Sequence, residues 1–320
     1  MSSKPLSCLI IDYMHLSIIP LLEDLGLVVS YQPEIKAAEV KNILPDFDGL
    51  VVRSKLFISE EVLSGANRLQ FIARAGAGVD NIDEVALKNR HIKLFNAPEG
   101  NSDAVGEFTL GLLLALFRNI VPADKEVRES KWLREENRGE EIMGKTIGLI
   151  GYGNMGRAFA KRLAGFSCQV LAYDKNDGIL SDNYANMVSL EQLFASADVV
   201  SFHIPYTPEN KHLGNEAFFN SFQKNIWVIN TARGEIINQT DLVKLLQSGK
   251  IKGAALDVLE NEKLNTLNET QKTNFTYLSQ ATNVILTPHI GGWSHQSYVK
   301  INSVLVQKIK NFLHGVAISS

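Results

Sequence analysis

The sequence predicts an α/β fold with parallel sheets, and three observations support this prediction. Short runs rich in β-branched and other apolar residues alternate with helical patterns through the 320 residues of the chain. This order is typical of parallel sheets joined by right-handed crossovers. A glycine-rich segment at residues 151–156, Gly-Tyr-Gly-Asn-Met-Gly, lies between a predicted strand and a predicted helix. It begins nearly halfway along the chain, so we expect one α/β unit before it, and the length allows two domains of ordinary size.

The first unit is predicted to contain alternating strands and helices. The strands are expected at residues 7–11, 27–31, 49–52, 71–73 and 93–95, with helices between them at residues 18–24, 37–43 and 59–63. Residues 101–119 predict a long apolar helix that bridges the two units, with Ser102 and Asp103 as its expected N-cap. Its apolar run, residues 108–117, falls well short of the roughly 20 residues that a membrane span needs, so we expect a buried helix.

The second unit continues the alternation. Its strands are expected at residues 145–150, 169–173, 199–203, 226–230, 253–257 and 284–286. Its first helix is expected at residues 157–164. A last helix is expected at residues 299–312. Residues 259–283 are polar, rich in Asn, Thr and Gln, and show no apolar period. Such segments seldom build a core, so we expect a surface excursion there.

The glycine-rich segment has the context of a dinucleotide-binding turn. Gly151 would allow a tight turn, Gly153 would let the backbone approach a pyrophosphate, and Gly156 would let helix and strand pack closely. The phosphates would then lie at a helix N-terminus, where N–H groups and the helix dipole favour anions. The alternative is an ordinary strand–turn–helix without a ligand. Asp174, eighteen positions after Gly156 at the end of the next strand, favours a nicotinamide dinucleotide site with NAD as the cofactor.

Three further predicted strands are followed by polar side chains suited to catalysis. Arg233 follows the strand at 226–230, Glu262 lies five residues after Asp257, and His289 follows the strand at 284–286. Ligands of open α/β sheets bind outside the carboxyl ends of the strands, so these side chains could form a substrate clamp, an orienting carboxylate and an acid/base. Taken singly, each is more often a solvated charge or a structural histidine. Together with a cofactor fold they favour catalysis.

Composition narrows the class of partner. The formal net charge is −3, so the surface shows no charge excess that would attract nucleic acid or an anionic membrane, and we expect a small-molecule substrate. Cys8 and Cys168 each lie in an apolar run, which favours reduced thiols and a reducing compartment. The apolar stretch at residues 6–12 is too short for a signal peptide. We therefore expect a cytoplasmic protein, and no metal site is predicted.

An ordered set of motifs resembles one family along essentially the full chain. The set comprises Val52-Arg53-Ser54, the segment Arg74-Ala75-Gly76-Ala77-Gly78-Val79-Asp80-Asn81-Ile82-Asp83, the glycine turn, His203-Ile204-Pro205, residues 230–234, Ala255-Leu256-Asp257-Val258 and residues 287–292. The chain is similar to the D-2-hydroxyacid dehydrogenases, and most similar within them to the D-3-phosphoglycerate dehydrogenases. The resemblance implies two Rossmann-like, doubly wound parallel-sheet domains. Residues 1–98 and 290–320 would form a discontinuous substrate (catalytic) domain, residues 99–289 the NAD-binding domain, and the protein would be a homodimer through the latter.

The same resemblance assigns roles to individual residues. Arg233 would bind the substrate carboxylate and keto oxygen, His289 would be the acid/base, and Glu262 would be its partner. Backbone N–H groups of Ala77 and Gly78 would hold the carboxylate. Asp257 would reach the nicotinamide carboxamide. The NAD site would be lined by Gly151, Gly153, Asn154, Met155, Gly156, Asp174, His203, Pro205, Thr231, Ala232 and Asp257.

Two positions depart from the family pattern. The glutamate is usually followed by proline, whereas Lys263 follows Glu262 here and the next loop is longer. Glu260 is therefore the alternative partner of the histidine. Trp293 stands where the phosphoglycerate enzymes usually have a small residue. If its side chain points into the pocket, substrate choice would change.

Basic positions bear on the substrate. Arg53 with Ser54, Arg74 and Arg134 match positions near the phosphate end of the phosphoglycerate enzymes' pocket, and Arg134 would reach the partner subunit's pocket. A dianionic phosphate favours arginine forks, although each arginine alone could be a solvated surface charge. We therefore expect oxidation of 3-phosphoglycerate to 3-phosphohydroxypyruvate, the entry to serine biosynthesis. The alternatives are a glyoxylate/hydroxypyruvate reductase or other D-2-hydroxyacid dehydrogenase, and a catalytically inactive, NAD-sensing corepressor.

The last predicted helix ends near residue 312, close to the end of the 320-residue sequence. By the resemblance, we expect a short form without the C-terminal regulatory domain that many phosphoglycerate dehydrogenases carry. Feedback by serine through such a domain is therefore not expected.

Overall fold

A computed structural model describes residues 5–315 and divides the chain into two compact units. Unit 1 comprises Met1–Asn101 and Trp293–Ser320, and unit 2 comprises Ser102–Gly292. The chain passes from one unit to the other after Asn101 and again after Gly292. Each of these points lies three residues beyond the predicted domain limit. The ends of the predicted substrate domain, residues 1–4 and 316–320, lie outside the described residues. The role of each unit stays a prediction at this point.

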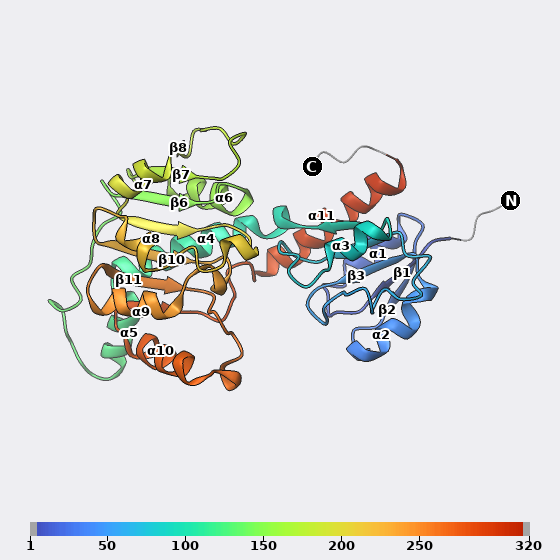
Figure 1. Cartoon of the computed structure of the whole chain (residues 1–320), viewed down its shortest axis with the longest axis horizontal. Helices are drawn as coiled ribbons and strands as arrows, with labels where there is room; N and C mark the ends of the chain where they lie inside the picture. The colour runs from blue at the N-terminus through green and yellow to red at the C-terminus, as the bar shows by residue number, and fades with distance from the viewer. Residues whose placement is uncertain (1–4, 316–320) are drawn as a thin grey trace. The chain divides into compact units, whose positions relative to one another are not determined.

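Unit 1 is built on a parallel sheet flanked by helices (Figure 1). In the described part of this unit the strand order is β2-β1-β3-β4-β5. The strands are β1 (Ser7–Ile10), β2 (Val28–Tyr31), β3 (Gly49–Val52), β4 (Phe71–Arg74) and β5 (Lys93–Asn96). The helices are α1 (Ile18–Glu23), α2 (Ala37–Ile43), α3 (Glu84–Asn89) and α11 (His295–Leu313), with a 3₁₀ turn η1 (Leu44–Asp46).

The two faces of this sheet carry separate cores because successive strand residues point in opposite directions. Cys8 and Ile10 of β1 face one side, where they share a core with α1 and α11. Leu9 and Ile11 face the other side, where they share a core with α2 and α3. Helices on both faces of a parallel sheet make the unit doubly wound.

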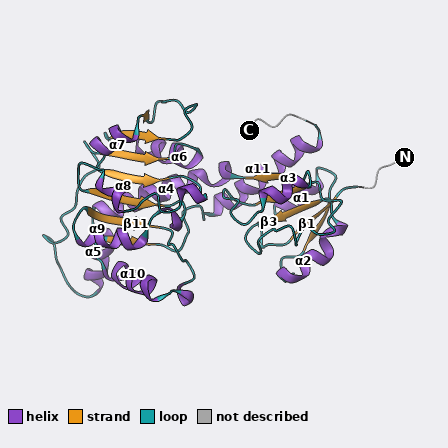
Figure 2. Ribbon diagram, viewed as in Figure 1, coloured by secondary structure: helices purple, strands orange, loops and turns teal. Residues whose placement is uncertain are grey.

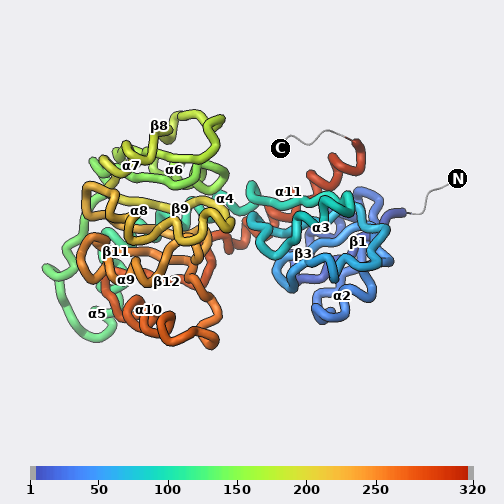
Figure 3. Tube along the Cα trace, viewed as in Figure 1, coloured from blue at the N-terminus to red at the C-terminus, as the bar shows by residue number. Residues whose placement is uncertain are grey.

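The discontinuity of unit 1 comes from α11. Leu305 and Ile309 of this helix are fully buried, in the same core as Ile18 and Leu22 of α1. Figure 3 shows the C-terminal helix beside segments from the start of the chain. Unit 1 is therefore completed by residues about 200 positions away from Asn101, the last residue of its first part.

Unit 2 contains a larger parallel sheet (Figure 2). The order of its described strands is β12-β11-β10-β9-β6-β7-β8. They are β6 (Thr146–Ile150), β7 (Gln169–Tyr173), β8 (Asn186–Met187), β9 (Val199–Phe202), β10 (Ile226–Asn230), β11 (Ile251–Leu256) and β12 (Val284–Leu286). Helical segments are α4 (Pro98–Phe117), α5 (Ile120–Arg128), α6 (Asn154–Leu163), α7 (Leu190–Ser196), η2 (Pro208–Asn210), α8 (Glu216–Asn220), η3 (Gly234–Ile236), α9 (Gln239–Gln247), η4 (Leu264–Thr266) and α10 (Glu269–Gln280).

The strand order of unit 2 changes direction between β6 and β9. From β6 the chain first proceeds outward through β7 and β8, and then returns to add β9 on the other side. Such a switch point opens a crevice at the carboxyl ends of the two central strands, where ligands of doubly wound sheets bind. Helices α4 and α6 cover one face of the sheet, and α7, α8 and α9 cover the other. The predicted fold class is confirmed in both units.

Two local predictions are wrong, and one helix was not predicted. Residues 59–63 form hydrogen-bonded turns and no helix, because the segment is short and the chain turns at Gly65, whose φ is +80°. The bridging helix begins at Pro98 and not at Ser102 or Asp103, since proline fits the first helical turn, where no N–H is needed. The polar stretch at 259–283 contains α10, which Asn268 and Gln271 start with a capping box.

Helix α4 is long and rich in apolar residues. No single helix among residues 5–315 has both the length and the composition of a membrane span. Helices α4 and α5 pass that test only as a pair, and they are bent by 63° at their junction.

Candidate active site

The glycine turn connects β6 to α6 at the switch point. Gly151 has a φ of +96°, and a Cβ there would lie 2.6 Å from the carbonyl oxygen of His203. A Cβ on Gly156 would lie 2.2 Å from the Gly151 carbonyl oxygen. A Cβ on Gly153 would meet no atom of the described chain within 4 Å. Two glycines are therefore required by packing, and the third leaves an open approach to the backbone.

The N-terminus of α6 fits an anion. Gly153 is its N-cap, and no described side chain caps the first turn, which begins at Asn154 and Met155. The N–H groups of that turn are therefore left to water or to a ligand. A pyrophosphate fits this combination of an open backbone and a helix N-terminus. The structure thus brings the five predicted residues of the turn together as expected.

Asp174 lies beside the turn, at the end of β7. Its Oδ2 accepts a hydrogen bond from the Tyr152 N–H at 2.8 Å, and its Oδ1 accepts one from the Asn176 N–H at 3.0 Å. The two bonds fix the carboxylate next to the place where a dinucleotide would bind. This is the position from which a carboxylate can accept a hydrogen bond from a ribose 2′-OH.

A network below the turn was not predicted. The hydroxyl of the fully buried Tyr152 donates to Asp182 Oδ1 at 2.8 Å, and Arg157 Nη1 forms an ion pair with Asp182 Oδ2 at 2.6 Å. The Arg157 guanidinium also lies 4.5 Å from the Tyr152 ring centre. Burial is the main cause that raises the pKa of Tyr152 above its ordinary value. Tyr152 belongs to the turn and Arg157 to α6, but Asp182 lies in a loop where no sequence pattern points to it.

His203 follows β9, on the other side of the switch point. Its Nε2 lies 2.9 Å from Ser201 Oγ, and its ring packs on Phe159 with the ring centres 5.7 Å apart. Burial lowers the pKa of His203 to about 3, so the imidazole is neutral at physiological pH. Its buried Nδ1 has no hydrogen-bond partner within residues 5–315, which is consistent with a ligand at this point. Pro205 is exposed two residues further along.

His289 and Glu262 form a pair. His289 Nδ1 lies 2.9 Å from Glu262 Oε1 and 3.1 Å from Oε2, which leaves Nε2 as the ring nitrogen that can exchange a proton with a substrate. Glu260 lies elsewhere. Its Oε1 is 2.5 Å from His212 Nε2, and its Oε2 accepts a hydrogen bond from the Gln239 N–H. The geometry therefore places Glu262, and not Glu260, at His289.

Asp257 holds the loop that carries His289. Its side chain is 2% exposed and accepts hydrogen bonds from Thr287 Oγ1 at 2.6 Å, Ile290 N–H at 2.9 Å and Gly291 N–H at 2.7 Å. Its backbone carbonyl also accepts the His289 N–H at 2.8 Å. Asp257 therefore positions the loop. The resemblance assigned it only to the carboxamide of NAD, a contact that stays a prediction.

Arg233 follows β10 in a tight turn. Asn230, which is almost fully buried, donates to the Arg233 carbonyl at 2.9 Å and accepts from the Ala232 N–H at 3.0 Å. Thr231 Oγ1 lies 3.2 Å from Thr109 Oγ1 of α4. A Cβ on Gly234 would lie 1.9 Å from the Leu259 carbonyl, so this turn packs directly against the segment that leads to Glu262.

The catalytic candidates thus come from adjacent strands. β10, β11 and β12 are neighbours in one parallel sheet, and Arg233, Glu262 and His289 follow their carboxyl ends in that order. A cavity of about 350 Å³ lies beside the pair of His289 and Glu262. It is lined by Asp257, Leu259, Glu262, Leu264, Phe275, Leu286, Thr287, Pro288 and His289.

In unit 1 the predicted substrate residues follow β3 and β4. The backbone N–H groups of Arg53 and Ser54 donate to the Asp12 carboxylate at 2.7 and 3.4 Å. The Arg53 guanidinium lies 3.8 Å from the centre of the Trp293 ring. Trp293, the departure from the family pattern, therefore lies over one of the predicted phosphate-binding arginines.

Arg74 lies against the glycine-rich segment that follows β4. Gly76 has a φ of +147°, and a Cβ on it would lie 1.9 Å from Arg74 Nη1. The Ala77 carbonyl accepts a hydrogen bond from Asn96 Nδ2 at 2.6 Å, and Gly78 follows it. Arg74 and the predicted carboxylate loop are therefore next to one another.

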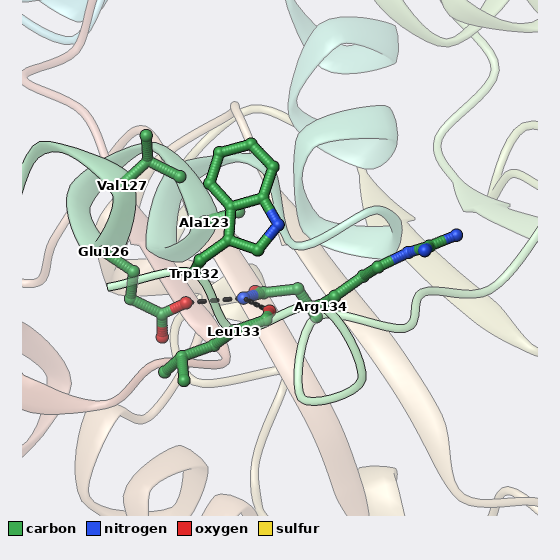
Figure 4. A pocket seen from close by; sticks show the side chains of 7 residues that line it. Ala123, Glu126, Val127, Trp132, Leu133 and Arg134 are labelled. Carbon is green, nitrogen blue, oxygen red and sulfur yellow. Dashed lines mark hydrogen bonds between the residues drawn. The ribbon is translucent and has the colours of Figure 1, made fainter. Parts of the chain in front are cut away.

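Arg134 lies in a different setting. It lines a pocket of about 300 Å³ together with Ala123, Glu126, Val127, Trp132, Leu133 and Asn137. The Asn137 side-chain amide donates hydrogen bonds to Glu126 and to the Leu133 carbonyl. Figure 4 shows the Arg134 side chain extending away from Trp132. Trp132 is 81% exposed. The structure groups Arg134 with an exposed apolar surface of unit 2.

Comparison with known proteins agrees with this geometry. Residues 110–291 match the family model described as D-isomer specific 2-hydroxyacid dehydrogenase, NAD binding domain. A hydroxypyruvate reductase of Thermotoga maritima is 37% identical, over 85% of this chain and 86% of that protein. The chain belongs to the D-isomer-specific 2-hydroxyacid dehydrogenase family. The matched residues, which the family model describes as an NAD binding domain, lie inside unit 2.

Other family members differ in length and name. A D-3-phosphoglycerate dehydrogenase of Archaeoglobus fulgidus is 34% identical over 99% of this chain and 57% of that protein. The chain spans 51–57% of the length of three prokaryotic phosphoglycerate dehydrogenases to which it is 34% identical. The structure of an Aquifex aeolicus D-lactate dehydrogenase with NAD and lactic acid aligns with a TM-score of 0.82 at 27% identity, over 97% of this chain and 96% of the other. The predicted family, enzyme class and cofactor NAD are confirmed, whereas the roles of single residues stay predictions.

Proposed function

We propose that this dehydrogenase oxidises 3-phosphoglycerate to 3-phosphohydroxypyruvate with NAD, in serine biosynthesis. The observation that carries the reaction type is the 2.9 Å contact between His289 Nδ1 and Glu262 in the NAD-binding unit. A phosphorylated substrate is supported by Arg53 and Arg74 of unit 1, since guanidinium groups are well suited to a dianionic phosphate. The matched phosphoglycerate dehydrogenases add to this support.

The chain's own residues account for the proton and for the orientation of the substrate. When bound, NAD supplies the acceptor for the hydride that leaves C2 of the hydroxy acid. His289 takes the hydroxyl proton at Nε2, and Glu262 holds the tautomer through Nδ1 and stabilises the imidazolium. Arg233 binds the carboxylate and the oxygen that becomes the keto group. The hydroxy acid thereby loses one hydride and one proton and becomes the oxo acid.

Two other functions are weighed against this proposal. A hydroxypyruvate or glyoxylate reductase would use the same His289, Glu262 and Arg233, and the Thermotoga relative supports it. It would have no use for a phosphate-binding arginine. An inactive NAD-sensing corepressor is disfavoured because a protein that only senses NAD needs no acid/base pair. Turnover of NADH with any 2-oxo acid decides against it.

We also propose that the protein is a homodimer that works in the cytoplasm. The exposed apolar side chains of Val127 and Trp132, beside Arg134, form a surface suited to a second copy of the chain. Cys8 is buried and Cys168 partly buried, and both are free thiols, which suits a reducing compartment.

A panel of 2-oxo acids with NADH tests the substrate. Phosphohydroxypyruvate, hydroxypyruvate, glyoxylate and pyruvate would each be compared by kcat/KM. We expect phosphohydroxypyruvate to exceed the others by at least about tenfold, since one charge-assisted contact to phosphate contributes on the order of 1.5–3 kcal/mol. Equal or higher values for the unphosphorylated acids would replace the proposal by the reductase.

A further inference from the structure

The guanidinium of Arg53 lies against aromatic rings of α11 and of the residue before its N-cap. Its Cζ atom is 3.8 Å from the Trp293 ring centre and 5.3 Å from that of Tyr298. The two rings are stacked on one another, with centres 6.2 Å apart and planes 30° apart. All three residues belong to unit 1. The distances are those of cation–π contacts.

The rings have fixed places in the fold. Ser294 is the N-cap of α11 and forms a capping box with Ser297. Trp293 therefore stands just before the cap and Tyr298 at the fourth helical position, the two positions of a hydrophobic staple. The Tyr298 hydroxyl also donates to the Tyr13 carbonyl at 2.8 Å. The rings are thus held by the start of the helix and not by Arg53 alone.

Arg53 is held from its other end as well. Its backbone N–H donates to Asp12, which is 8% exposed. Partial burial lowers the pKa of Arg53, although an arginine stays protonated. No carboxylate in the described part of the chain forms an ion pair with its guanidinium, unlike Arg68 or Arg90, which are paired with Asp48 and Glu60.

We propose that Trp293 is a positioning residue that holds Arg53 for a substrate phosphate and so determines specificity. A ring that stacks on the face of a guanidinium leaves the N–H groups at its edge for an anion. The stack restricts a long, flexible side chain before substrate arrives, and such preorganisation lowers the cost of binding. The inference rests on the proposed function for the identity of the anion, and on Arg53, Trp293 and Tyr298 for the geometry.

Substitutions at Trp293 separate this role from that of a staple. Trp293→Leu keeps an apolar side chain for the staple but removes the aromatic face, whereas Trp293→Phe keeps both. With phosphohydroxypyruvate, we expect Trp293→Leu to raise KM about 3- to 30-fold, the range of a cation–π contact. We expect kcat, and both kcat and KM for hydroxypyruvate, to change less than about twofold. The KM of Trp293→Phe for phosphohydroxypyruvate should stay close to the wild-type value. Phe57→Leu, at an exposed aromatic residue of unit 1, is the matched control and should leave both substrates unaffected.

If Trp293→Leu raised KM equally for phosphohydroxypyruvate and hydroxypyruvate, or for neither, Trp293 would only support the helix. Calorimetric titration of the NAD-free proteins with 3-phosphoglycerate separates this inference from the proposed function, because it does not depend on turnover. Weaker binding in Trp293→Leu than in wild type and Trp293→Phe supports the positioning role, whichever oxo acid is turned over best. Equal binding in all three proteins, or none in wild type, overturns it. A wild-type preference for unphosphorylated acids overturns the proposed function alone.

Discussion

His289 has a φ of +56°, a region that residues with a side chain rarely occupy. The contacts of Asp257 with the backbone of the same loop offset this strain, and the pairing with Glu262 then fixes the ring. A histidine held in this way from both its backbone and its Nδ1 is suited to repeated proton transfer at Nε2. The arrangement supports a catalytic and not merely a structural histidine.

Replacing this histidine tests its role. We expect His289→Asn to lower kcat by about 10²–10⁴, the usual contribution of a positioned proton-transfer group, and to leave NADH affinity unchanged. Steady-state kinetics and NADH titration by fluorescence measure the two quantities. His295→Asn, at an exposed histidine in α11, is the control and should retain full activity. Near-normal turnover of the His289 variant would remove this residue from the mechanism.

The fixed carboxylate of Asp174 bears on cofactor choice. A carboxylate at this place accepts a bond from a ribose 2′-OH and repels a 2′-phosphate, so we expect NAD to be preferred over NADP by well over tenfold. Asp174→Ala should narrow that gap. The ratio of kcat/KM for NAD to kcat/KM for NADP measures this preference. Asp177→Ala, at an exposed aspartate of the same loop, is the control. Equal use of the two cofactors by the wild-type enzyme would contradict the prediction.

Burial of His203 predicts a dependence of stability on pH. The pKa is about 3 in the folded protein and about 6.5 in an unfolded chain, so between these values the unfolded state carries a proton that the folded state lacks. The free energy of unfolding of the NAD-free enzyme should therefore fall as the pH is lowered through this window, by up to about 1.4 kcal/mol per pH unit for this group. Urea titrations of wild type and His203→Gln between pH 7 and 5 measure the difference. Parallel curves for the two proteins would show that His203 does not titrate in this way.

Residues at the ends of strands could be predicted well, and the contacts between loops could not. Arg233, Glu262 and His289 follow three neighbouring strands, so their place along one edge of the parallel sheet could be predicted. The choice between Glu260 and Glu262 required the structure, because both follow β11 and only the path of the loop shows that Glu260 turns to His212. The anchoring by Asp257 was missed for the same reason.

At the scale of elements, the loop between β7 and β8 is tied to the glycine turn through Asp182. Its carboxylate accepts hydrogen bonds from the Tyr152 hydroxyl and from the N–H groups of Tyr184 and Ala185, and it pairs with Arg157. Desolvation acts to raise the pKa of Asp182, but these hydrogen bonds outweigh it and lower the pKa. One side chain thereby connects the turn, the start of α6 and the following loop.

Removing this carboxylate should affect both stability and cofactor binding. Asp182→Ala leaves the buried Tyr152 hydroxyl without its acceptor, which costs roughly 1–3 kcal/mol. We expect a lower midpoint of urea unfolding and weaker NAD binding, with kcat at saturating NAD little changed. Asp177→Ala again serves as the control, since Asp177 is exposed and makes no hydrogen bond within the described residues. Unchanged stability would show that water replaces Asp182 as the acceptor.

The elements that sequence patterns located best are the buried strands, because continuous apolar runs have few alternatives in a parallel sheet. Helix α10 was missed, although the capping box of Asn268 and Gln271 was a usable signal. The turns at residues 59–63 show the opposite error. There a short apolar pattern has helical spacing, but the chain forms only hydrogen-bonded turns.

At the scale of the whole molecule, the exposed apolar surface of α5 and the following loop predicts self-association. Trp132→Asp combined with Val127→Asp should convert a dimer into monomers, because two charges would have to be buried at the interface. Sedimentation velocity measures the change from twice the chain mass to one. Val85→Asp, at an exposed valine of α3 in unit 1, is the matched control. A wild-type protein that sediments as a monomer would contradict the prediction.

The two-unit organisation has a consequence for the synthesis of the chain. Unit 2 is continuous, so it can fold as soon as residue 292 has left the ribosome. The first 101 residues are made earlier, yet the core they share with Leu305 and Ile309 is incomplete until α11 emerges. The part of that apolar face which α11 covers therefore stays exposed while the whole of unit 2 is translated. The part of the chain made first is the part that finishes folding last, and during this interval a chaperone has an apolar surface to protect.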